Sequence, residues 1–390
     1  MNLPDRGSER KPRRFLLGHL FSNGDCLYAT AIARQIKADF PDSHLTWAIG
    51  SRCRDILDGN PHVDAVWEVP MDSEREIKDQ WTDAFQILSR FQTEALKRKD
   101  QGEFDDIFFT QFRHERFEDY DGTIRNFVLQ AYPRPITVPL SPVVRLNTKE
   151  IKNVSDFVAA HPVIGGTSQV ILFECSPKSR QSFVTPDYAL AASRQLLLRH
   201  PDTCIILSSN HRIVTDDERL IDGSTVSFRE NAELSKCCTL LIGCSSGISW
   251  LLTSDWAKRL PMIQLLSSES PMPNSFIHDH ERNGLSTEQI IELVDCSADR
   301  LCNCVSAVFS KGFAEARDEF SQRLSLNPAY LFAMGQLLAQ RRDHMALRYL
   351  QKTFRRDGAS GELLLRSMWL YLRVLLGRLK RLLLRTTSSD

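Results

Sequence analysis

An acidic residue stands early in the chain, in a turn where a carboxylate can do proton chemistry. Asp25 follows a short apolar segment and precedes a helical pattern, within the run Phe-Ser-Asn-Gly-Asp-Cys-Leu at 21–27. A carboxylate at such a turn can take a proton from a hydroxyl group, which is the work of a general base. Asp is also a preferred residue at a helix start, where it accepts backbone N–H bonds. The sequence leaves both roles open for Asp25.

A second candidate is a turn of small and hydroxyl-bearing residues at 243–249. An apolar segment runs into Gly-Cys-Ser-Ser-Gly-Ile-Ser, and a helical pattern follows. Small side chains let a phosphate approach the free N–H groups of a helix start, where the helix dipole also favours an anion. Ser245, Ser246 and Gly247 are therefore candidate diphosphate ligands. An ordinary serine cap beside a tight turn is the alternative.

The third candidate is a pair of cations in the same half of the chain. Lys178 and Arg180 follow the end of another apolar segment. Fixed cations can neutralise a diphosphate leaving group and so replace a metal ion. A solvated polar loop is the alternative for this segment.

Metal ligation has little support in the sequence. Ten cysteines are scattered without a Cys-x-x-Cys pair, which argues against a zinc site and fits reduced thiols in the cytoplasm. The run His278-Asp279-His280 follows two prolines, and two histidines do not make a metal site. We expect this run to lie in a solvated surface loop, and we expect neither a metal nor a resident cofactor.

Composition and charge restrict the class of protein. With 390 residues, of which 42% are hydrophobic and 25% charged, the chain is long enough for two or three globular domains. The 49 Lys and Arg residues balance 49 Asp and Glu residues, which argues against a general nucleic-acid binder. Residues 301–390 hold 15 basic and 7 acidic residues. This basic end indicates a local anionic partner.

The elements that must position these residues alternate between strands and helices. Apolar segments predict strands, and apolar residues at helical spacing predict helices. The predicted strands are 15–20, 45–49, 63–69, 106–110, 170–174, 203–208, 240–243 and 262–266. The predicted helices are 27–40, 54–57, 71–102, 124–131, 187–199, 230–237 and 248–256. Such alternation indicates parallel sheets with right-handed crossovers, while four prolines at 132–143 predict an extended loop.

We therefore predict an α/β protein with two Rossmann-like domains that face a cleft. The predicted divisions are an acceptor domain at 1–165, a nucleotide-sugar domain at 166–300 and a helical extension at 301–390. Ligands of such sheets bind beyond the carboxyl ends of the strands. Each of the three candidate sites directly follows the carboxyl end of a predicted strand.

A basic segment closes the chain. Residues 363–385 hold six Lys or Arg residues and no acid, and at helical spacing these fall on one broad arc with leucines and Trp369 on the other side. Such a helix can lie on an anionic membrane surface. The alternative is a terminal helix that packs on the protein with its basic face in water. No segment is long and apolar enough to span a bilayer.

The chain resembles glycosyltransferase family 9, the lipopolysaccharide heptosyltransferases, which have the GT-B fold. The resemblance lies in Ser-Asn-Gly-Asp at 22–25, Phe40-Pro41 and Gly-Asn-Pro-His-Val-Asp at 59–64, and again in Leu-Ile-Gly-Cys-Ser-Ser-Gly at 241–247. The order of elements matches over about residues 13–300.

The resemblance implies an inverting, metal-independent transfer of a sugar, such as heptose, from a nucleotide diphosphate sugar to a hydroxyl of a growing surface glycan. It implies that Asp25 is the base and that Ser22, Asn23 and Gly24 form the acceptor-side loop. Lys178 or Arg180, with the 245–247 turn, would hold the diphosphate. The partners would be this donor and a glycan or lipid-linked acceptor, with the protein cytoplasmic or peripheral on the inner membrane face.

Two residues depart from the family pattern. The family usually has an acidic residue where Ser245 stands and a histidine where Trp250 stands. These departures leave open a transferase that uses a UDP- or GDP-sugar and a non-catalytic scaffold built on a decayed transferase. The basic segment at 363–385 leaves open a third alternative, a basic-tailed membrane adaptor.

Overall fold

The computed structural model describes residues 11–71, 77–111, 114–177, 181–358 and 360–386, with the backbone alone at 77–85, 114–115 and 379–386. By its internal contacts the chain forms two compact units. The first comprises Met1–Gln111 and Ala131–Arg145, and the second comprises Phe112–Gln130 and Leu146–Asp390. The segment 112–130 therefore interrupts the first unit and belongs to the second.

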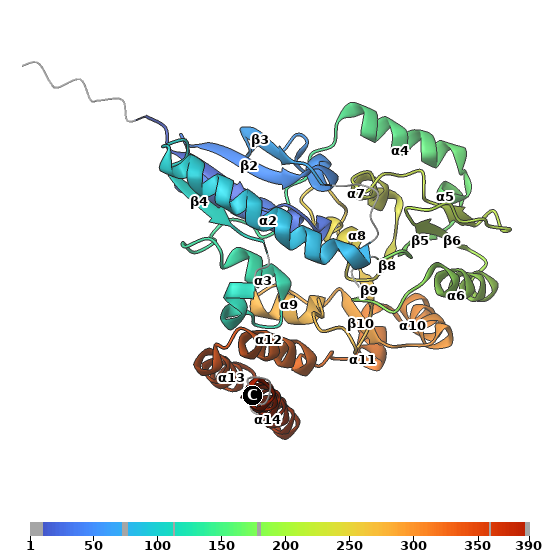
Figure 1. The fold of residues 1–390 in the computed structure, drawn as a ribbon. Helices are drawn as coiled ribbons and strands as arrows, with labels where there is room; N and C mark the ends of the chain where they lie inside the picture. The colour runs from blue at the N-terminus through green and yellow to red at the C-terminus, as the bar shows by residue number, and fades with distance from the viewer. Residues whose placement is uncertain (1–10, 72–76, 112–113, 178–180, 359, 387–390) are drawn as a thin grey trace, which may run out of the picture. The chain divides into compact units, whose positions relative to one another are not determined.

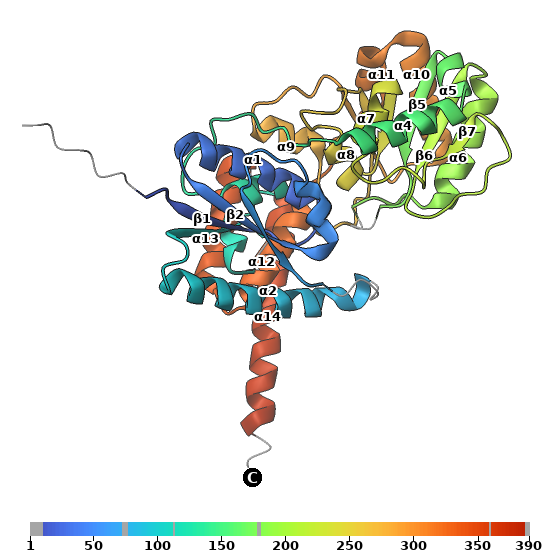
Figure 2. The same ribbon diagram turned by 90° about the horizontal axis from the view of Figure 1, so that it is seen from above.

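A parallel sheet in the order β3-β2-β1-β4 forms the centre of the first unit. Its strands are β1 (Arg14–Gly18), β2 (His44–Gly50), β3 (Ala65–Val69) and β4 (Asp106–Phe109), and the 3-10 helix η1 (Ser51–Leu57) follows β2. Helices α1 (Asn23–Asp39) and α2 (Ile77–Asp100) cover opposite faces of this sheet (Figures 1 and 2). Strand β1 is buried from Phe15 onward because it has a strand on each side and a helix on each face.

The proline-rich segment 132–143 is an extended loop, as predicted, and it lies along α1. The side-chain carbonyl of Gln35 accepts the backbone N–H groups of Thr137 (2.7 Å) and Val138 (3.1 Å). The N–H of Val143 donates to the hydroxyl of Thr30 at 2.9 Å. These bonds satisfy backbone groups that have no sheet partner, so the loop belongs to the first unit.

The second unit contains a six-stranded parallel sheet in the order β10-β9-β8-β5-β6-β7. The strands are β5 (Gln169–Glu174), β6 (Thr203–Ser208), β7 (Leu220–Asp222), β8 (Leu240–Gly243), β9 (Met262–Leu266) and β10 (Ile290–Val294). Helices α5 (Val163–Gly166), α6 (Pro186–Arg199), α7 (Asn231–Leu234), η3 (Ser235–Cys237), α8 (Gly247–Leu251) and α9 (Phe276–Arg282) connect or precede them. The strand order reverses between β5 and β8, which is where sheets of this type bind ligands.

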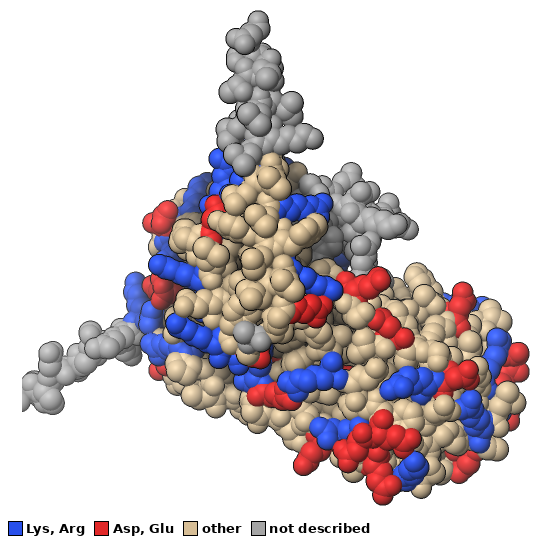
Figure 3. Space-filling view, turned by 90° about the horizontal axis from the view of Figure 1, so that it is seen from below, with Lys and Arg blue, Asp and Glu red and all other residues tan. Residues whose placement is uncertain are grey.

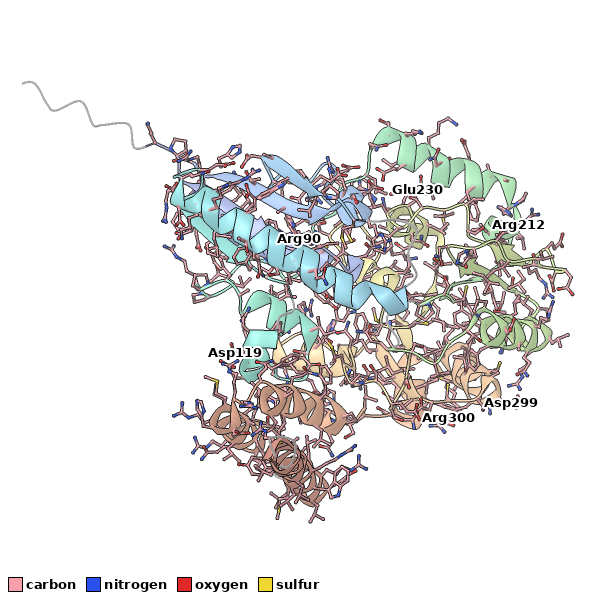
Figure 4. All side chains as sticks on the ribbon, viewed as in Figure 1. Arg90, Asp119, Arg212, Glu230, Asp299 and Arg300 are labelled. Atoms are coloured by element: carbon pink, nitrogen blue, oxygen red, sulfur yellow. The ribbon has the colours of Figure 1, made fainter. Side chains whose placement is uncertain are left out.

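Helix α4 (Thr148–Ala160) explains why residues after 146 belong to the second unit. Glu150 at its start accepts the Arg229 guanidinium at 2.7 Å. The Asn153 side chain donates to Glu230 at 2.8 Å, next to α7 (Figure 4). Polar contacts of this kind fix α4 on the second unit.

The helical extension divides into two parts within the second unit. Its helices are α10 (Ala298–Lys311), α11 (Phe313–Phe320), α12 (Asn327–Ala339), α13 (Asp343–Asp357) and α14 (Gly361–Thr386). Helix α10 packs on α6 and shares the core of the sheet. Helices α12, α13 and α14 instead enclose a separate core with the segment 112–130, through Phe117, Tyr120 and Phe127. That segment carries η2 (His114–Asp119) and α3 (Ile124–Leu129).

The α/β class with two Rossmann-like sheets and a helical C-terminal extension is confirmed by these elements. The compact units do not end at 165 and 300, because 112–130 and 146–165 both pack with the later part of the chain. The roles predicted for the domains stay predictions. All ten cysteines are free thiols.

Candidate functional site

Asp25 lies in the first turn of α1, directly after the carboxyl end of β1. The N-cap position belongs to Ser22, whose backbone is left-handed (φ 72°) and whose side chain caps nothing. The Asp25 carboxyl is half-buried, and no hydrogen bond to it occurs within the part of the chain that the structure describes. Burial raises the pKa of Asp25 to about 7. A carboxyl group of this pKa can both take and return a proton near neutral pH.

A buried amide holds the peptide that leads into this turn. The Gln111 side-chain carbonyl accepts the N–H groups of Leu20 (2.9 Å) and Phe21 (3.2 Å), and its amide N–H donates back to the Phe21 carbonyl (3.3 Å). Gln111 is buried and follows β4, the strand that pairs with β1. Gln111 therefore bonds the backbone that follows β1, as the backbone of a paired strand would. The role of Gln111 is not predicted by the sequence pattern, whose only signal is a polar residue just after a predicted strand.

Two further contacts fix the same turn. His19 is buried, and its Nδ1 lies 2.8 Å from the Thr110 hydroxyl; burial lowers the pKa of His19 to about 3, which keeps the imidazole neutral. On the other side, the Cys53 thiol of η1 donates to the Asn23 side chain at 3.1 Å. Asp25 is thus presented on a backbone that is held from β4 and η1.

In the second unit, the turn between β8 and α8 closes around a carboxylate of the chain itself. Glu174, at the end of β5, accepts the backbone N–H groups of Cys244 (2.9 Å) and Ile248 (3.3 Å). It also accepts the hydroxyls of Ser246 and Ser249, the latter at 2.6 Å. Glu174 is only 2% exposed. Four donors from the predicted diphosphate turn therefore converge on this internal carboxylate.

The rest of the turn is held from β9 and is tightly packed. Ser245 is buried with a left-handed backbone (φ 49°), its N–H donates to the Gln264 side chain at 2.8 Å, and its hydroxyl donates to the Asn274 carbonyl. A Cβ at Gly243 would lie 2.3 Å from the Ser249 hydroxyl and 2.5 Å from Gln264, so only glycine fits there. Of the predicted ligands, Ser246 and Gly247 are half-buried, whereas the Ser245 side chain faces inward.

The cations predicted for the diphosphate, Lys178 and Arg180, lie outside the described residues. The first described residue after them, Gln181, accepts the N–H of Ser267 at 3.0 Å through its carbonyl. Ser267 directly follows β9. Gln181 itself therefore lies beside the carboxyl end of β9.

The run 278–280 is not the solvated loop that the sequence predicts. It lies in α9, and all three side chains are buried. Asp279 accepts the Arg125 guanidinium of α3, with Nε at 3.0 Å, and the His278 Nε2–H donates to the Leu324 carbonyl at 2.7 Å. The prediction is wrong because these polar groups find partners on α3 and on the segment before α12. Among the described residues, no group of three or more His, Cys, Asp or Glu side chains could hold a metal ion.

Trp250, where the family pattern has histidine, is a core residue. It is fully buried, and its ring stacks on Phe276 with centroids 3.7 Å apart and an interplanar angle of 11°. The Arg125 guanidinium lies 5.2 Å from the Trp250 ring centroid. Trp250 therefore joins α8 to α9 and α3 and presents no polar group to a ligand.

Helix α14 differs from the basic helix predicted at 363–385. Leu363, Ser367 and Leu370 face α12. Arg378 turns inward as well, because Asp343 at the start of α13 accepts its guanidinium at 2.9 and 3.0 Å. The outward face is apolar, with six exposed large side chains at Leu364, Leu365, Met368, Trp369, Leu372 and Leu376. It forms an uncharged ridge beside blue side chains in Figure 3.

Sequence comparison finds no family model that matches this chain and no curated protein that matches it. Comparison with solved structures does find likenesses. A glycosyltransferase family 9 structure from Veillonella parvula has a TM-score of 0.51 at 12% identity, and the match covers 85% of this chain and 99% of that one.

Two Escherichia coli structures are also similar, each matched over 77% of this chain and 99% of its own length. They are the ADP-heptose lipopolysaccharide heptosyltransferase II (TM-score 0.47, 13% identity) and the heptosyltransferase WaaC with ADP (TM-score 0.42, 11% identity). Of these three structures, the one from Veillonella parvula shares the fold of this chain with a TM-score above 0.5. The chain therefore has the GT-B type of α/β fold found in a solved glycosyltransferase family 9 structure, and the predicted resemblance is confirmed at the level of the fold.

Proposed function

We propose that the chain is an inverting, metal-independent glycosyltransferase that moves a sugar from a nucleotide diphosphate sugar to a hydroxyl of a surface-glycan acceptor. The observation that carries the proposal is Asp25, a half-buried residue just after β1 whose carboxyl group has a pKa near 7 and no hydrogen bond to it among the described residues. The family resemblance assigns the base to this position, and the likeness in fold supports it.

The chemistry would be one in-line displacement at the anomeric carbon. Asp25 would take the proton of the attacking hydroxyl, and the bond from the sugar to the diphosphate would break on the opposite face. Ser22, Asn23 and Gly24 would meet the acceptor. The departing diphosphate would be held by Lys178 or Arg180 and by the 245–247 turn. No resident cofactor is needed for this step.

Two classes of donor sugar are proposed for this one reaction. Heptose follows from the resemblance, whereas a UDP- or GDP-sugar is the alternative because the buried Trp250 stands where the family has histidine. A panel of nucleotide sugars separates these donors. A chain that binds a nucleotide but transfers no sugar would instead be the scaffold alternative.

We further propose that the protein works in the cytoplasm, on the inner face of an anionic membrane, where a lipid-linked acceptor would lie. No described helix has the length and apolar character needed to cross a bilayer. Support comes from the exposed apolar face of α14, and from the absence of acidic residues between 363 and 385. Trp369, 61% exposed, and Arg373, 5.2 Å from its ring, are suited to a lipid–water interface.

The test of the transferase is Asp25→Asn, with Asp42→Asn as a control because Asp42 is an exposed residue of the same unit. We expect D25N to lose transfer by about 10²–10⁴-fold while its affinity for the donor nucleotide stays unchanged. D42N should keep wild-type activity. Full transfer by D25N would remove the base assignment.

A further inference from the structure

The carboxyl group of Glu174 lies where a ligand anion is expected in this fold. It stands at the end of β5, and its four donors come from the turn after β8. Strands β5 and β8 are neighbours at the point where the strand order reverses. Crevices of this kind receive phosphate groups because backbone N–H groups and hydroxyls converge there.

Hydrogen-bond donors of the β8–α8 turn surround both oxygens of Glu174. Two N–H groups and two hydroxyls donate to its two oxygens, which can accept about four bonds. Its negative charge is therefore held by the same turn that a diphosphate would use.

We infer that Glu174 is a specificity-determining residue that works against diphosphate binding at the β8–α8 turn. Its carboxylate takes up inner donors of the turn, and its charge repels a second anion at short range. The inference rests on the proposed function only in taking this crevice as the donor site. The class of donor that suits the crevice is one whose diphosphate uses only those donors of the 245–247 turn that Glu174 leaves free, and that does not displace Glu174 from Cys244, Ile248 and Ser249.

The second unit offers a matched control. Glu292 of β10 is also a buried glutamate, and it likewise accepts a serine hydroxyl (Ser275, 2.8 Å) and the N–H of a residue in the first turn of a helix (Ile277 of α9, 3.1 Å). It lies at the far edge of the sheet from β5. Glu292→Gln therefore removes a buried carboxylate from the same unit, as Glu174→Gln does, but it leaves the charge at the β8–α8 turn unchanged.

The experiment measures binding of pyrophosphate and of nucleoside diphosphates to the wild type, E174Q and E292Q by calorimetry. We expect E174Q to bind pyrophosphate at least tenfold more tightly than the wild type, which is about 1.4 kcal/mol, and E292Q to match the wild type. If Glu174 had a purely structural role, E174Q would bind pyrophosphate more weakly than the wild type. The amide of glutamine cannot accept from all four donors, so the turn would lose its shape. Equal or weaker binding by E174Q would overturn the inference.

A second variant, Glu174→Ala, also removes the charge and should tighten pyrophosphate binding in the same direction. If neither variant folds, as judged by circular dichroism, Glu174 is only a structural clamp and the inference fails. Pyrophosphate is not a sugar donor, so its binding is measured without transfer. Tighter binding by E174Q with no turnover in the wild type would refute the proposed function alone. Turnover in the wild type with unchanged E174Q binding would refute this inference alone.

Discussion

The protonation of Asp25 links its proposed role to the stability of the protein. Burial raises the pKa of this carboxyl from 3.8 to about 7, so the folded chain keeps a proton that the unfolded chain has already lost between these values. The free energy of unfolding therefore falls as the pH rises through this window, and the stabilising effect of the proton is gone above pH 7. Asparagine at position 25 has no such ionisation.

We expect D25N to exceed the wild type in stability at pH 8 by about 1–4 kcal/mol. The difference should shrink toward zero near the pH at which the unfolded Asp25 titrates. Denaturant unfolding of both proteins at pH 8 and pH 4 measures it, and an equal difference at the two pH values would contradict the raised pKa.

Among the residues of the site, the sequence predicts only those that stand in a recognisable local motif. Asp25 stands in a recognisable turn. Gln111 and Glu174 do not, because Gln111 acts on the exit of β1 and Glu174 on the turn after β8. Each lies at the end of one strand and works on a neighbour that is distant in the chain. Their roles depend on strand order, which the sequence pattern does not determine.

Helix α14 combines an inner and an outer apolar face, and the elements around it decide which residues lie on each. Leu370 and Val374 face inward and pack against α12 and its neighbours, which the pattern of basic and apolar residues does not predict. Similarly, α9 was hidden by the prolines before it, although Ser275 caps it through the N–H of His278 (3.1 Å). By contrast, β6 has the predicted bounds because its six residues are all buried.

The proposed membrane contact is tested on this outer face with the double variant Leu365→Glu and Leu372→Glu. We expect the wild type to cosediment with phosphatidylserine-containing vesicles, to release them at high salt, and to ignore pure phosphatidylcholine vesicles. The double variant should bind at least tenfold more weakly, because two leucines can no longer enter the interface.

Leu198→Glu is the control, since Leu198 is 83% exposed on α6. Unchanged vesicle binding by the double variant would contradict the proposal. A dimer of the wild type that the double variant dissolves would instead assign the outer face of α14 to a second copy of the chain.

On the scale of the whole molecule, α12–α14 are an obligatory part of the second unit. They enclose Phe117, Tyr120 and Phe127, and Arg342 of the loop before α13 pairs with Glu118 at 2.9 Å. We expect a chain that ends at residue 326 to lose several degrees in melting temperature and to aggregate, because this apolar cluster would be exposed. A chain that ends at residue 378 should melt like the full protein. Calorimetry and size-exclusion chromatography decide between these outcomes.

Residues 112–130 belong to the second unit although they lie within the first unit in the chain, and this has a consequence for synthesis of the protein. The ribosome produces Phe117, Tyr120 and Phe127 roughly 200 residues before Leu326 and the helices that cover them. During that interval the nascent chain carries three uncovered aromatic rings in the middle of a half-finished first unit. Synthesis of this protein therefore includes a period in which these three rings lack the helices that cover them in the folded chain.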